Sequence, residues 1–525
     1  MKRPSRRSLL VLALVAFAAA AGCAATSPRT ATVAVISTAP PATQQAGAVA
    51  APLAANDVEQ RVAAATTDYR AGDLHTHSGL SHDGVHPEEE IVQAAFDRYG
   101  LTWLCATDHG GKSIHKPNGS PLTPTSWMWR SIEKYSWPVI RELRLTYAPD
   151  NIVQGVEWHV PTRDHAGVGI AATSAEAIAE FEYRFDELDA DTSRPALKKH
   201  NKTTADDLAA AKWLGTHHPS SSFLIVNHPS RRLANTPKSL RQLNDAAPSV
   251  AFGMEGLLGR QKLPARGGYE FEYGARTKYA RPYGGADYFT AKVGGVWDSL
   301  LGEGRRFYTF GDSDFHDPST DFWPGEYEKI FTATAGTSDT QLIAGLRSGN
   351  SFSVTGGIVD RLAFTAESGA HAATMGQTLS VAPGADVTIT VGFRVPASRG
   401  GGGAPQVDHI DLIEGLTHEK ARPGTAAYSS ATNATTKVVK RLAKADGPWR
   451  GSGSDGSTFE VTYVMRAVRA NAYVRLRATN LGLGVAGQTD ARGNPLIDKK
   501  NQNSAAAAWA DSWMYSNPIF IRVAK

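Results

Sequence analysis

Apolar and polar positions divide the chain into two regions with different periods. From residue 57 to about residue 355, apolar strand-length runs alternate with helical patterns, as in the predicted helix Glu88–Tyr99, which follows Pro87 and ends at Gly100. Further predicted elements are a strand at 151–158, a helix at 203–214, a strand at 222–227, a helix at 296–301 and a strand at 306–310. Strands that alternate with helices predict an α/β domain with a parallel sheet, either open or closed into a barrel.

Residues 356–525 show short alternating strands separated by turn residues. The predicted strands are 362–364, 387–391, 409–413, 459–463, 472–477 and 516–521. This spacing is typical of a β-sandwich, so we expect an all-β sandwich-like C-terminal domain. No chemistry is visible in this region, whereas most of the histidines lie before it.

The first 22 residues predict a targeting segment, in which four basic residues precede an apolar run too short to span a membrane. Ser5–Leu10 resembles a twin-arginine export signal through Arg6 and Arg7, although an ordinary charged leader is the alternative. Ala20–Cys23 resembles a bacterial lipoprotein processing site, which usually has Leu where Ala20 stands. We therefore expect an exported cell-envelope lipoprotein at the periplasmic face of a bacterial membrane, tethered by a lipid on Cys23.

Composition changes this picture in three ways. Residues 23–56 are rich in Ala, Thr and Pro and predict a disordered linker. Removal of residues 1–22 takes the basic count from 55 to 51, which equals the acidic count of 51, so no nucleic-acid-binding surface is expected. Cys105 is then the only cysteine besides Cys23, so the mature chain has no intramolecular disulfide. A buried apolar role is favoured for Cys105, with metal ligation as the alternative.

The candidate chemistry begins in Asp73–Gly84. His75 and His77 alternate along a predicted strand and therefore share one face, and the turn that follows adds His82 and Asp83. Taken alone, two surface histidines explain this pattern equally well. Later apolar strands also end in metal-binding residue types, which are His109, Glu157, His228, Asp314 and His316, and His165 is expected in the turn 161–166 that follows Glu157. Because α/β domains place their sites at the C-terminal ends of strands, these residues are expected to converge.

These segments resemble the PHP superfamily, the polymerase and histidinol phosphatase domains. The motifs are Asp-Leu-His75-Thr-His77, Asp83-Gly, Thr-Asp-His109, Gly-Val-Glu157, His165, Asn-His228-Pro and Gly-Asp-Ser-Asp314-Phe-His316, in the family's order. The resemblance implies a distorted seven-stranded (β/α) TIM-like barrel over residues 57–355. The family commonly reads Ser-Asp-Gly where this chain reads Ser-His-Asp-Gly, so either His82 or Asp83 is the ligand. Asp83 is favoured because it keeps its place beside Gly84.

The resemblance also implies two to three divalent metal ions and phosphoester hydrolysis. Carried over by position, His75, His77, Glu157 and Asp314 hold one metal, and Glu157 bridges to a second held by His165 and His228. Asp83, His109 and His316 hold the third. Mixed imidazole and carboxylate ligands suit zinc, manganese or iron.

Such a site predicts hydrolysis by a metal-activated hydroxide. A carboxylate shared between two cations holds them about 3.5 to 4 Å apart, which suits a phosphoryl group. Glu157, Asp314 and His228 act through the metals, and Arg231, Arg232 and Lys112 either orient phosphate or are solvated loop charges. His159 is either a packing residue or a proton carrier.

The expected partner is a phosphorylated small molecule. A non-catalytic envelope binding protein with a retained metal site and a metal-dependent amide hydrolase are the alternatives. The sequence leaves the oligomeric state open.

Overall fold

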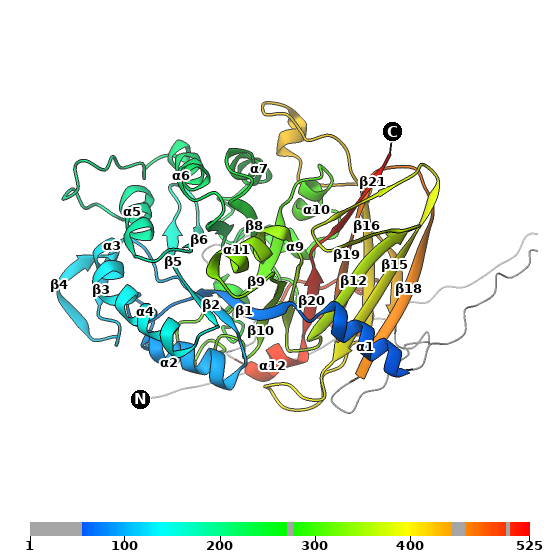
Figure 1. The fold of residues 1–525 in the computed structure, drawn as a ribbon, viewed down its shortest axis with the longest axis horizontal. Helices are drawn as coiled ribbons and strands as arrows, with labels where there is room; N and C mark the ends of the chain where they lie inside the picture. The colour runs from blue at the N-terminus through cyan, green and yellow to red at the C-terminus, as the bar shows by residue number, and fades with distance from the viewer. Residues whose placement is uncertain (1–54, 270–276, 444–456, 500–503, 525) are drawn as a thin grey trace, which may run out of the picture. The chain divides into compact units, whose positions relative to one another are not determined.

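The computed structural model describes residues 55–269, 277–443, 457–499 and 504–524 (Figure 1). The targeting segment, Cys23 and the predicted linker up to residue 54 lie outside the described residues. The described chain begins with helix α1 (Ala55–Ala65), and residues 53–525 form one compact unit by their internal contacts.

Seven strands of the large sheet carry the N-terminal region. In spatial order they are β1 (Tyr69–Thr76), β2 (Trp103–Ala106), β5 (Asn151–His159), β6 (His165–Ile170), β7 (Ser222–Val226), β8 (Ala251–Leu257) and β9 (Tyr308–Gly311). The pairs β1–β2, β2–β5, β7–β8 and β8–β9 are parallel. Strand β6 is antiparallel to both β5 and β7, so six of the seven strands run the same way.

The prediction of a purely parallel sheet is wrong at β6. Only the short turn 160–164 separates β5 from β6, and a connection this short joins antiparallel strands, whereas a parallel pair needs a longer crossover. His165, which we expected in the turn, is the first residue of β6. The mixed α/β class is confirmed. An isolated parallel bridge joins Thr76, at the end of β1, to Phe315, which follows β9.

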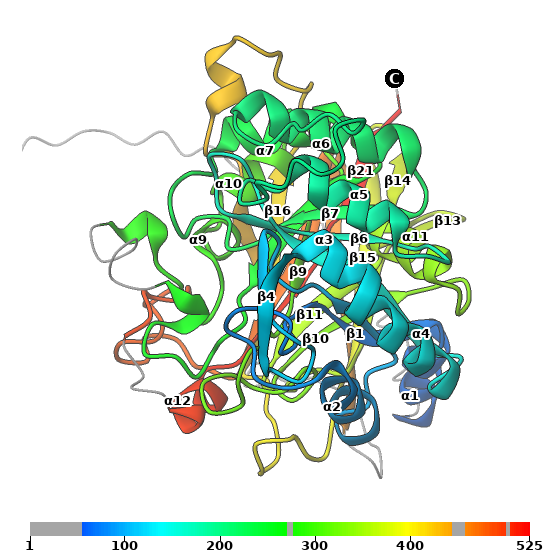
Figure 2. The same ribbon diagram turned by 90° about the vertical axis from the view of Figure 1, so that its left-hand side faces the viewer.

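Helices cover this part of the sheet (Figures 1 and 2). They are α2 (Glu88–Gln93), α3 (Met128–Ser131), α4 (Trp137–Thr146), α5 (Glu176–Phe185), α6 (Thr204–His217), α7 (Pro237–Ala246), α9 (Tyr288–Ala291), α10 (Val296–Leu301) and α11 (Asp339–Ser348). A π-helical turn, η1 (Ala94–Arg98), continues α2, so the two together fill the predicted helix Glu88–Tyr99. The α6 prediction is also confirmed: Thr203 and Asp206 form a capping box that fixes its start.

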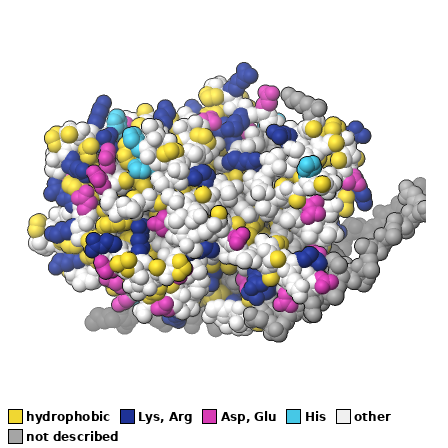
Figure 3. Space-filling model, viewed as in Figure 1, with side chains coloured by type: hydrophobic (Ala, Val, Ile, Leu, Met, Phe, Trp, Pro, Cys, Tyr) yellow, Lys and Arg dark blue, Asp and Glu magenta, His cyan; other side chains and the backbone are white. Residues whose placement is uncertain are grey.

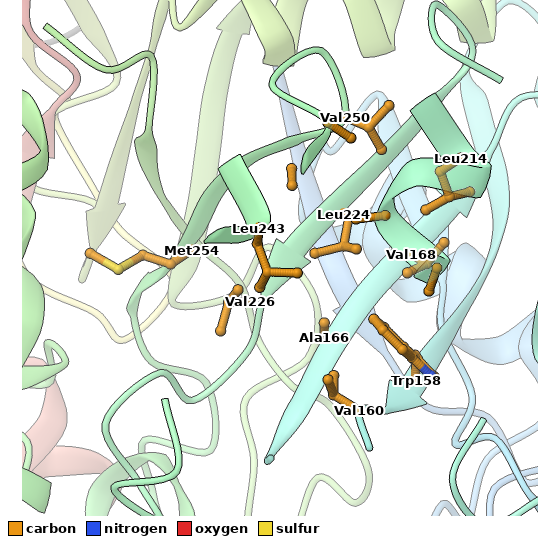
Figure 4. Close-up of a cluster of buried hydrophobic side chains, with 14 of the residues drawn as sticks. Trp158, Val160, Ala166, Val168, Leu214, Leu224, Val226, Leu243, Val250 and Met254 are labelled. Carbon is orange, nitrogen blue, oxygen red and sulfur yellow. The ribbon is translucent and has the colours of Figure 1, made fainter. Parts of the chain in front are cut away.

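A hydrophobic core lies between the central strands and α6 and α7 (Figure 4). Trp158 of β5, Val168 of β6 and Leu224 of β7 are buried against Leu214 of α6. Figure 4 shows Leu243 of α7 on the same side of the strands. Since these side chains are fully enclosed, they hold the strand ends in fixed positions.

Strands β3 (Lys112–His115) and β4 (Pro121–Trp127) form a separate two-stranded sheet in the N-terminal region, which ends with β10 (Glu328–Ala333) and β11 (Ser351–Thr355). The strands of the C-terminal region are β12 (Arg361–Ser368), β13 (His371–Thr374), β14 (Thr378–Val381), β15 (Ala385–Val395), β16 (His409–Leu416), β17 (Lys437–Ala443), β18 (Ser457–Val468), β19 (Ala472–Thr479), β20 (Trp513–Ser516) and β21 (Ile519–Val523). A four-stranded sheet has the order β13-β12-β15-β18. A shared core joins this sheet, through Phe364 and Ile389, to Leu476 and Ile521 of the large sheet.

One sheet runs through both regions of the chain. Strand β10 pairs with β1 on one side and with β11 on the other, and β11 pairs with β20 near the C-terminus. The predicted boundary at 355/356 therefore falls at the end of a strand inside this sheet, and separate folding of the two halves stays a prediction. A short helix, α12 (Ala505–Ala510), lies within the region predicted to contain only strands.

Three further observations concern the burial of Cys105, the surface charge and the length of the helices. Cys105 lies in β2 and is fully buried, as predicted, and burial raises the pKa of its thiol. On the face in Figure 3, basic and acidic side chains are interspersed. None of the helices in the described part of the chain has the length and apolar character needed to span a bilayer.

Candidate metal centre

The end of β1 supplies two adjacent imidazoles. The Nε2 atoms of His75 and His77 lie 2.9 Å apart, and both side chains are buried. The carboxylate of Asp73 accepts the backbone N–H groups of His75 at 3.0 Å and of Ser313 at 3.1 Å. The hydrogen bond from Ser313 connects β1 with the segment after β9. His75 and His77 therefore lie next to the residues that follow β9.

Glu157, on β5, lies at the middle of the cluster. Its carboxylate oxygens lie 3.1 Å from His75 Nε2, 3.5 Å from His77 Nε2, 2.9 Å from His109 Nδ1, 2.9 Å from His165 Nδ1 and 3.3 Å from His228 Nε2. One buried carboxylate thus contacts five imidazoles from four segments of the chain, since His75 and His77 both come from the end of β1. This is the arrangement that a bridging ligand requires.

Asp314 and Asp83 supply the other carboxylates. Asp314 Oδ1 lies 3.3 Å from the Nε2 atoms of both His75 and His77. Asp83 lies 3.3 Å from His316 Nε2 and 3.6 Å from His109 Nε2. Of the two alternatives left open by the sequence, Asp83 is therefore the one whose carboxylate faces the cluster.

The His82 side chain has a different position. It is 52% exposed, and its ring centroid lies 4.8 Å from that of His109. His82 therefore lies over the cluster at its solvent side.

Neighbouring polar groups orient the histidine rings. The Nδ1 of His77 lies 3.0 Å from Ser81 Oγ, that of His316 donates to the Asp314 carbonyl at 2.7 Å, and that of His228 lies 2.9 Å from the Glu255 carboxylate. Each of these contacts engages Nδ1, so Nε2 is the ring nitrogen that faces the cluster. Such outer partners fix ring orientation in metal sites.

Protonation differs among the ligands. Burial lowers the pKa of His165 to about 4, although the nearby Glu157 carboxylate acts to raise it. Burial also favours neutral Glu157, but His165, His75 and His109 hold the pKa of Glu157 well below its usual value. His109 and His228 behave in the opposite way: although burial lowers their pKa values, Glu157 raises that of His109 to about 10 and Glu255 raises that of His228 to about 9. A bound cation would displace those two protons.

The donor set fits divalent cations. Asp314 Oδ1 and His316 Nε2 are buried and make no hydrogen bond within the described residues. Buried polar atoms are rarely left unpaired, so a missing partner at this point is expected. Groups of ligand atoms that lie within 4.8 Å of one another include His77, Asp83, His109 and His316; His75, His77 and Glu157; His75, His228 and Asp314; and Glu157, His165 and His228. A further group of this kind, which the sequence did not predict, joins His159 to His109 and His165.

A cavity of about 400 Å³ opens over the cluster. Its basic lining residues are Arg163, Arg231, Arg232 and Arg260, and Val160 and Leu188 supply apolar surface. Arg231 is held by Asp164 through two hydrogen bonds of 2.9 and 2.7 Å. Lys112 is not among the lining residues; it is exposed in strand β3 (Lys112–His115) with Nζ 5.6 Å from the Trp127 ring centroid. This position fits the alternative of a solvated loop charge, and a role of Lys112 in orienting phosphate stays a prediction.

Several residues of the site were not predicted. Glu255 lies near the end of β8, two residues before Leu257, in an apolar strand similar to those that were used, so the sequence held a signal for it. Arg260 and Arg163 had no such signal, because isolated arginines in loops are common. The buried Asp186, which accepts the His159 N–H at 2.9 Å, lies on a distant segment. Sequence spacing does not reveal a pair of this kind.

The fold and the site together define a mixed α/β protein with a candidate metal centre built from histidines and carboxylates at one edge of its sheet. No family model and no curated protein matches the sequence. Among solved structures, the chain is weakly similar to a two-domain protein from Bacteroides vulgatus ATCC 8482 that contains a predicted PHP-like metal-dependent phosphoesterase. The two chains are 13% identical with a TM-score of 0.34, over 82% of this chain and 94% of the other. A similarity this weak carries no argument.

Proposed function

We propose that this protein is a metal-dependent phosphoesterase with a PHP-type distorted barrel. The observation that carries the proposal is the position of Glu157, whose carboxylate contacts five imidazoles beneath an arginine-lined cavity. His75, His77, Asp83, His109, Glu157, His165, His228, Asp314 and His316 would hold two to three zinc, manganese or iron ions. When bound, these ions would supply Lewis-acid activation of water and of the phosphoryl group.

The arginines give the cavity its preference for an anion. Arg231 donates from Nε and Nη2 to the Asp164 carboxylate and lines the cavity, so its Nη1 would be the donor that meets a phosphoryl oxygen. Asp164 is buried and precedes His165 in the sequence. Through its hydrogen bonds, Asp164 therefore holds Arg231 next to the proposed metals. An amide substrate has no charge for these arginines to bind, so a phosphoester is favoured over an amide.

His159 is placed to protonate the leaving group. Its Nδ1 lies 3.1 Å from the buried Asp186 carboxylate, and the residue lines the cavity. Asp186 therefore orients the ring so that Nε2 points away from it. A histidine held in this manner by a carboxylate can donate a proton to a departing alkoxide.

The proposal is tested by a double variant, His75→Ala with Glu157→Gln. We expect hydrolysis of a phosphate-ester panel with added manganese, zinc or iron to be lost, together with most of the bound metal, because the bridging carboxylate and one terminal ligand are removed. His217→Ala, on the surface of α6, is the matched control and should change neither quantity. Unchanged metal stoichiometry in the double variant would show that the ligand assignment is wrong.

Metal binding without hydrolysis of any ester in the panel would favour the non-catalytic binding protein. Hydrolysis of amides but not of phosphate esters would favour the amide hydrolase. Both outcomes would reject the proposed activity while they leave the metal site intact.

We also propose that the protein is exported through the twin-arginine route and anchored at the periplasmic face by Cys23. The support is the sequence alone: Arg6 and Arg7 before an apolar run that ends close to Cys23. Arg6→Lys with Arg7→Lys should block export, whereas Cys23→Ala should allow export without lipidation. Cell fractionation separates the two phenotypes, and an arginine variant that reaches the envelope in normal amount would exclude this route.

A further inference from the structure

Four large apolar side chains on the described surface lie exposed on the loops around the cavity. They are Val85, Ile114, Leu188 and Leu233, with exposed fractions of 49%, 38%, 57% and 44%. Isolated exposed apolar residues are common, but several around one opening mark an interaction surface. We call these four residues the apolar rim.

Strand direction places the rim residues at one edge of the sheet. Strands β1, β2 and β7 run the same way, and the loops that follow them carry Val85, Ile114 and Leu233. The backbone N–H of Val85 donates to the carbonyl of the proposed ligand His316 at 3.2 Å. Leu188 lines the cavity directly. The rim residues therefore lie on the segments that follow these strands, at the edge of the sheet where the cavity opens, and Leu188 among them lines the cavity itself.

Basic side chains alternate with the apolar ones. Lys112 and Ile114 are both exposed on β3 while Ser113 between them is buried, so the two point outward together. Arg232, whose side chain is 39% exposed, precedes Leu233. Lys202 is bonded through Nζ to the carbonyl of Glu187, which lines the cavity, at 2.6 Å. Apolar groups that insert between lipids, with cations that meet anionic headgroups, are characteristic of membrane-surface binding.

We infer that the apolar rim docks on an anionic membrane surface and that the substrate is a phosphorylated lipid headgroup presented there to the cavity. This inference rests on the proposed phosphoesterase function. A cavity of about 400 Å³ is at the small end of ligand sites, so it admits a headgroup while the acyl chains stay in the bilayer. The arginines within the cavity bind the phosphoryl group, and the rim sets which molecules reach it.

The experiment uses the full-length chain with Cys23→Ser, so that no lipid is attached to any protein compared. The rim variant adds Ile114→Asp and Leu233→Asp, neither of which lines the cavity. The matched control adds Leu145→Asp on α4 and Leu416→Asp at the end of β16, which are 73% and 40% exposed and also lie outside the cavity lining. Each metal-loaded protein is sedimented with phosphatidylcholine vesicles that contain phosphatidylglycerol and phosphatidic acid.

Binding and hydrolysis are measured separately. We expect the rim variant to bind vesicles at least about tenfold more weakly than the control, because two apolar contacts are lost and two negative charges are added. Its hydrolysis of phosphatidic acid should fall in parallel, while hydrolysis of soluble p-nitrophenyl phosphate should match the control.

Equal vesicle binding by the rim variant and the control, or no vesicle binding by the parent protein, would overturn the inference. If the parent hydrolyses p-nitrophenyl phosphate in that case, the proposed function survives the loss of the docking surface. If rim-dependent binding appears but no ester is hydrolysed, the docking surface stands, and the proposed function and the lipid substrate are both rejected.

Discussion

Two buried charge clusters of this protein differ in the source of their positive charge. In the metal centre, Glu157, Asp314 and Asp83 face imidazoles, which carry a charge only when protonated. In the interface between the two regions, Asp298 of α10 faces Arg475 of β19 through hydrogen bonds of 2.8 and 2.7 Å, and both are fully buried. A guanidinium is permanently charged. The charge of the second cluster is therefore permanently paired, whereas the charge balance of the first depends on protons bound to its imidazoles or on an added cation.

The comparison separates a structural charge pair from a functional one. Asp298 also accepts hydrogen bonds from Tyr473 Oη at 2.9 Å and from the Gly294 N–H at 2.7 Å, so its oxygens are occupied by the protein. The centre instead keeps Asp314 Oδ1 without a hydrogen bond in the described part of the chain, beside a cavity. Buried charge alone thus does not mark a site; the centre differs from the interface pair in that a carboxylate oxygen without a hydrogen bond lies beside a cavity.

The largest stability effect is expected at the interface pair. Arg475→Leu leaves Asp298 buried without its cation, and the free energy of unfolding should fall by about 3 to 5 kcal/mol. Addition of Asp298→Leu should restore most of this loss, since the uncompensated charge is gone. Denaturant unfolding measures both variants. A double variant as unstable as Arg475→Leu would show that packing, not charge, dominates there.

Within the centre, His159→Gln tests proton donation. For an alkyl phosphate, kcat should fall by about 10² to 10³, because the departing alkoxide loses its acid. For p-nitrophenyl phosphate, whose leaving group needs no proton, the loss should be much smaller. Bound metal, measured by elemental analysis, should not change. If metal is lost instead, His159 is a tenth ligand.

Metal removal tests the comparison directly. Chelation should lower the free energy of unfolding by about 2.7 kcal/mol relative to protein held at a metal concentration 100 times its Kd. The effect arises because the carboxylates of the centre lose their compensating cation. The Glu157→Gln variant should show little response to chelator. A chelator effect of equal size in that variant would place the stabilising metal elsewhere.

Metal affinity should rise with pH. The pKa values of His109 and His228 are about 10 and about 9 in the metal-free protein, so both rings are protonated at neutral pH and must release protons on binding. Affinity should therefore increase by up to about 100-fold per pH unit below pH 9, by up to about tenfold between pH 9 and pH 10, and level off above pH 10. Titration calorimetry in buffers of different ionisation enthalpy counts the protons, and zero released protons would contradict this assignment.

The smallest effect is expected at Arg231. Arg231→Lys loses the paired hydrogen bonds with Asp164, so KM for a soluble phosphate ester should rise about tenfold with little change in kcat. Lys112→Ala is the control, because Lys112 lies outside the cavity lining. Equal changes in KM from the two variants would indicate general electrostatic attraction rather than a positioned guanidinium.

Much of the fold was predictable because periodicity reports local structure. The α6 helix and the β5 and β7 strands follow from apolar spacing, and His75 and His77 share a face because strands have period two. Strand β6 itself was not predicted, because His165 was expected in a turn, and the pattern of a strand does not encode its direction in any case. The position of Lys112 outside the cavity lining was not predictable, because proximity in sequence to His109 does not fix the course of a hairpin.

The outer partners of the site were harder to predict. Asp186 and Glu255 act on His159 and His228 through contacts between distant segments, which one sequence does not display. The two histidines themselves were visible at strand ends. Residues at the ends of predicted strands could thus be identified from the sequence, whereas residues whose role depends on tertiary packing could not.

The most direct test of the metal centre is anomalous diffraction from crystals grown with manganese or zinc. We predict at least two anomalous peaks, each about 2.0 to 2.3 Å from a carboxylate oxygen of Glu157, with His75 and His77 beside one and His165 and His228 beside the other. Crystals at saturating metal with no anomalous peak among these residues would contradict the account.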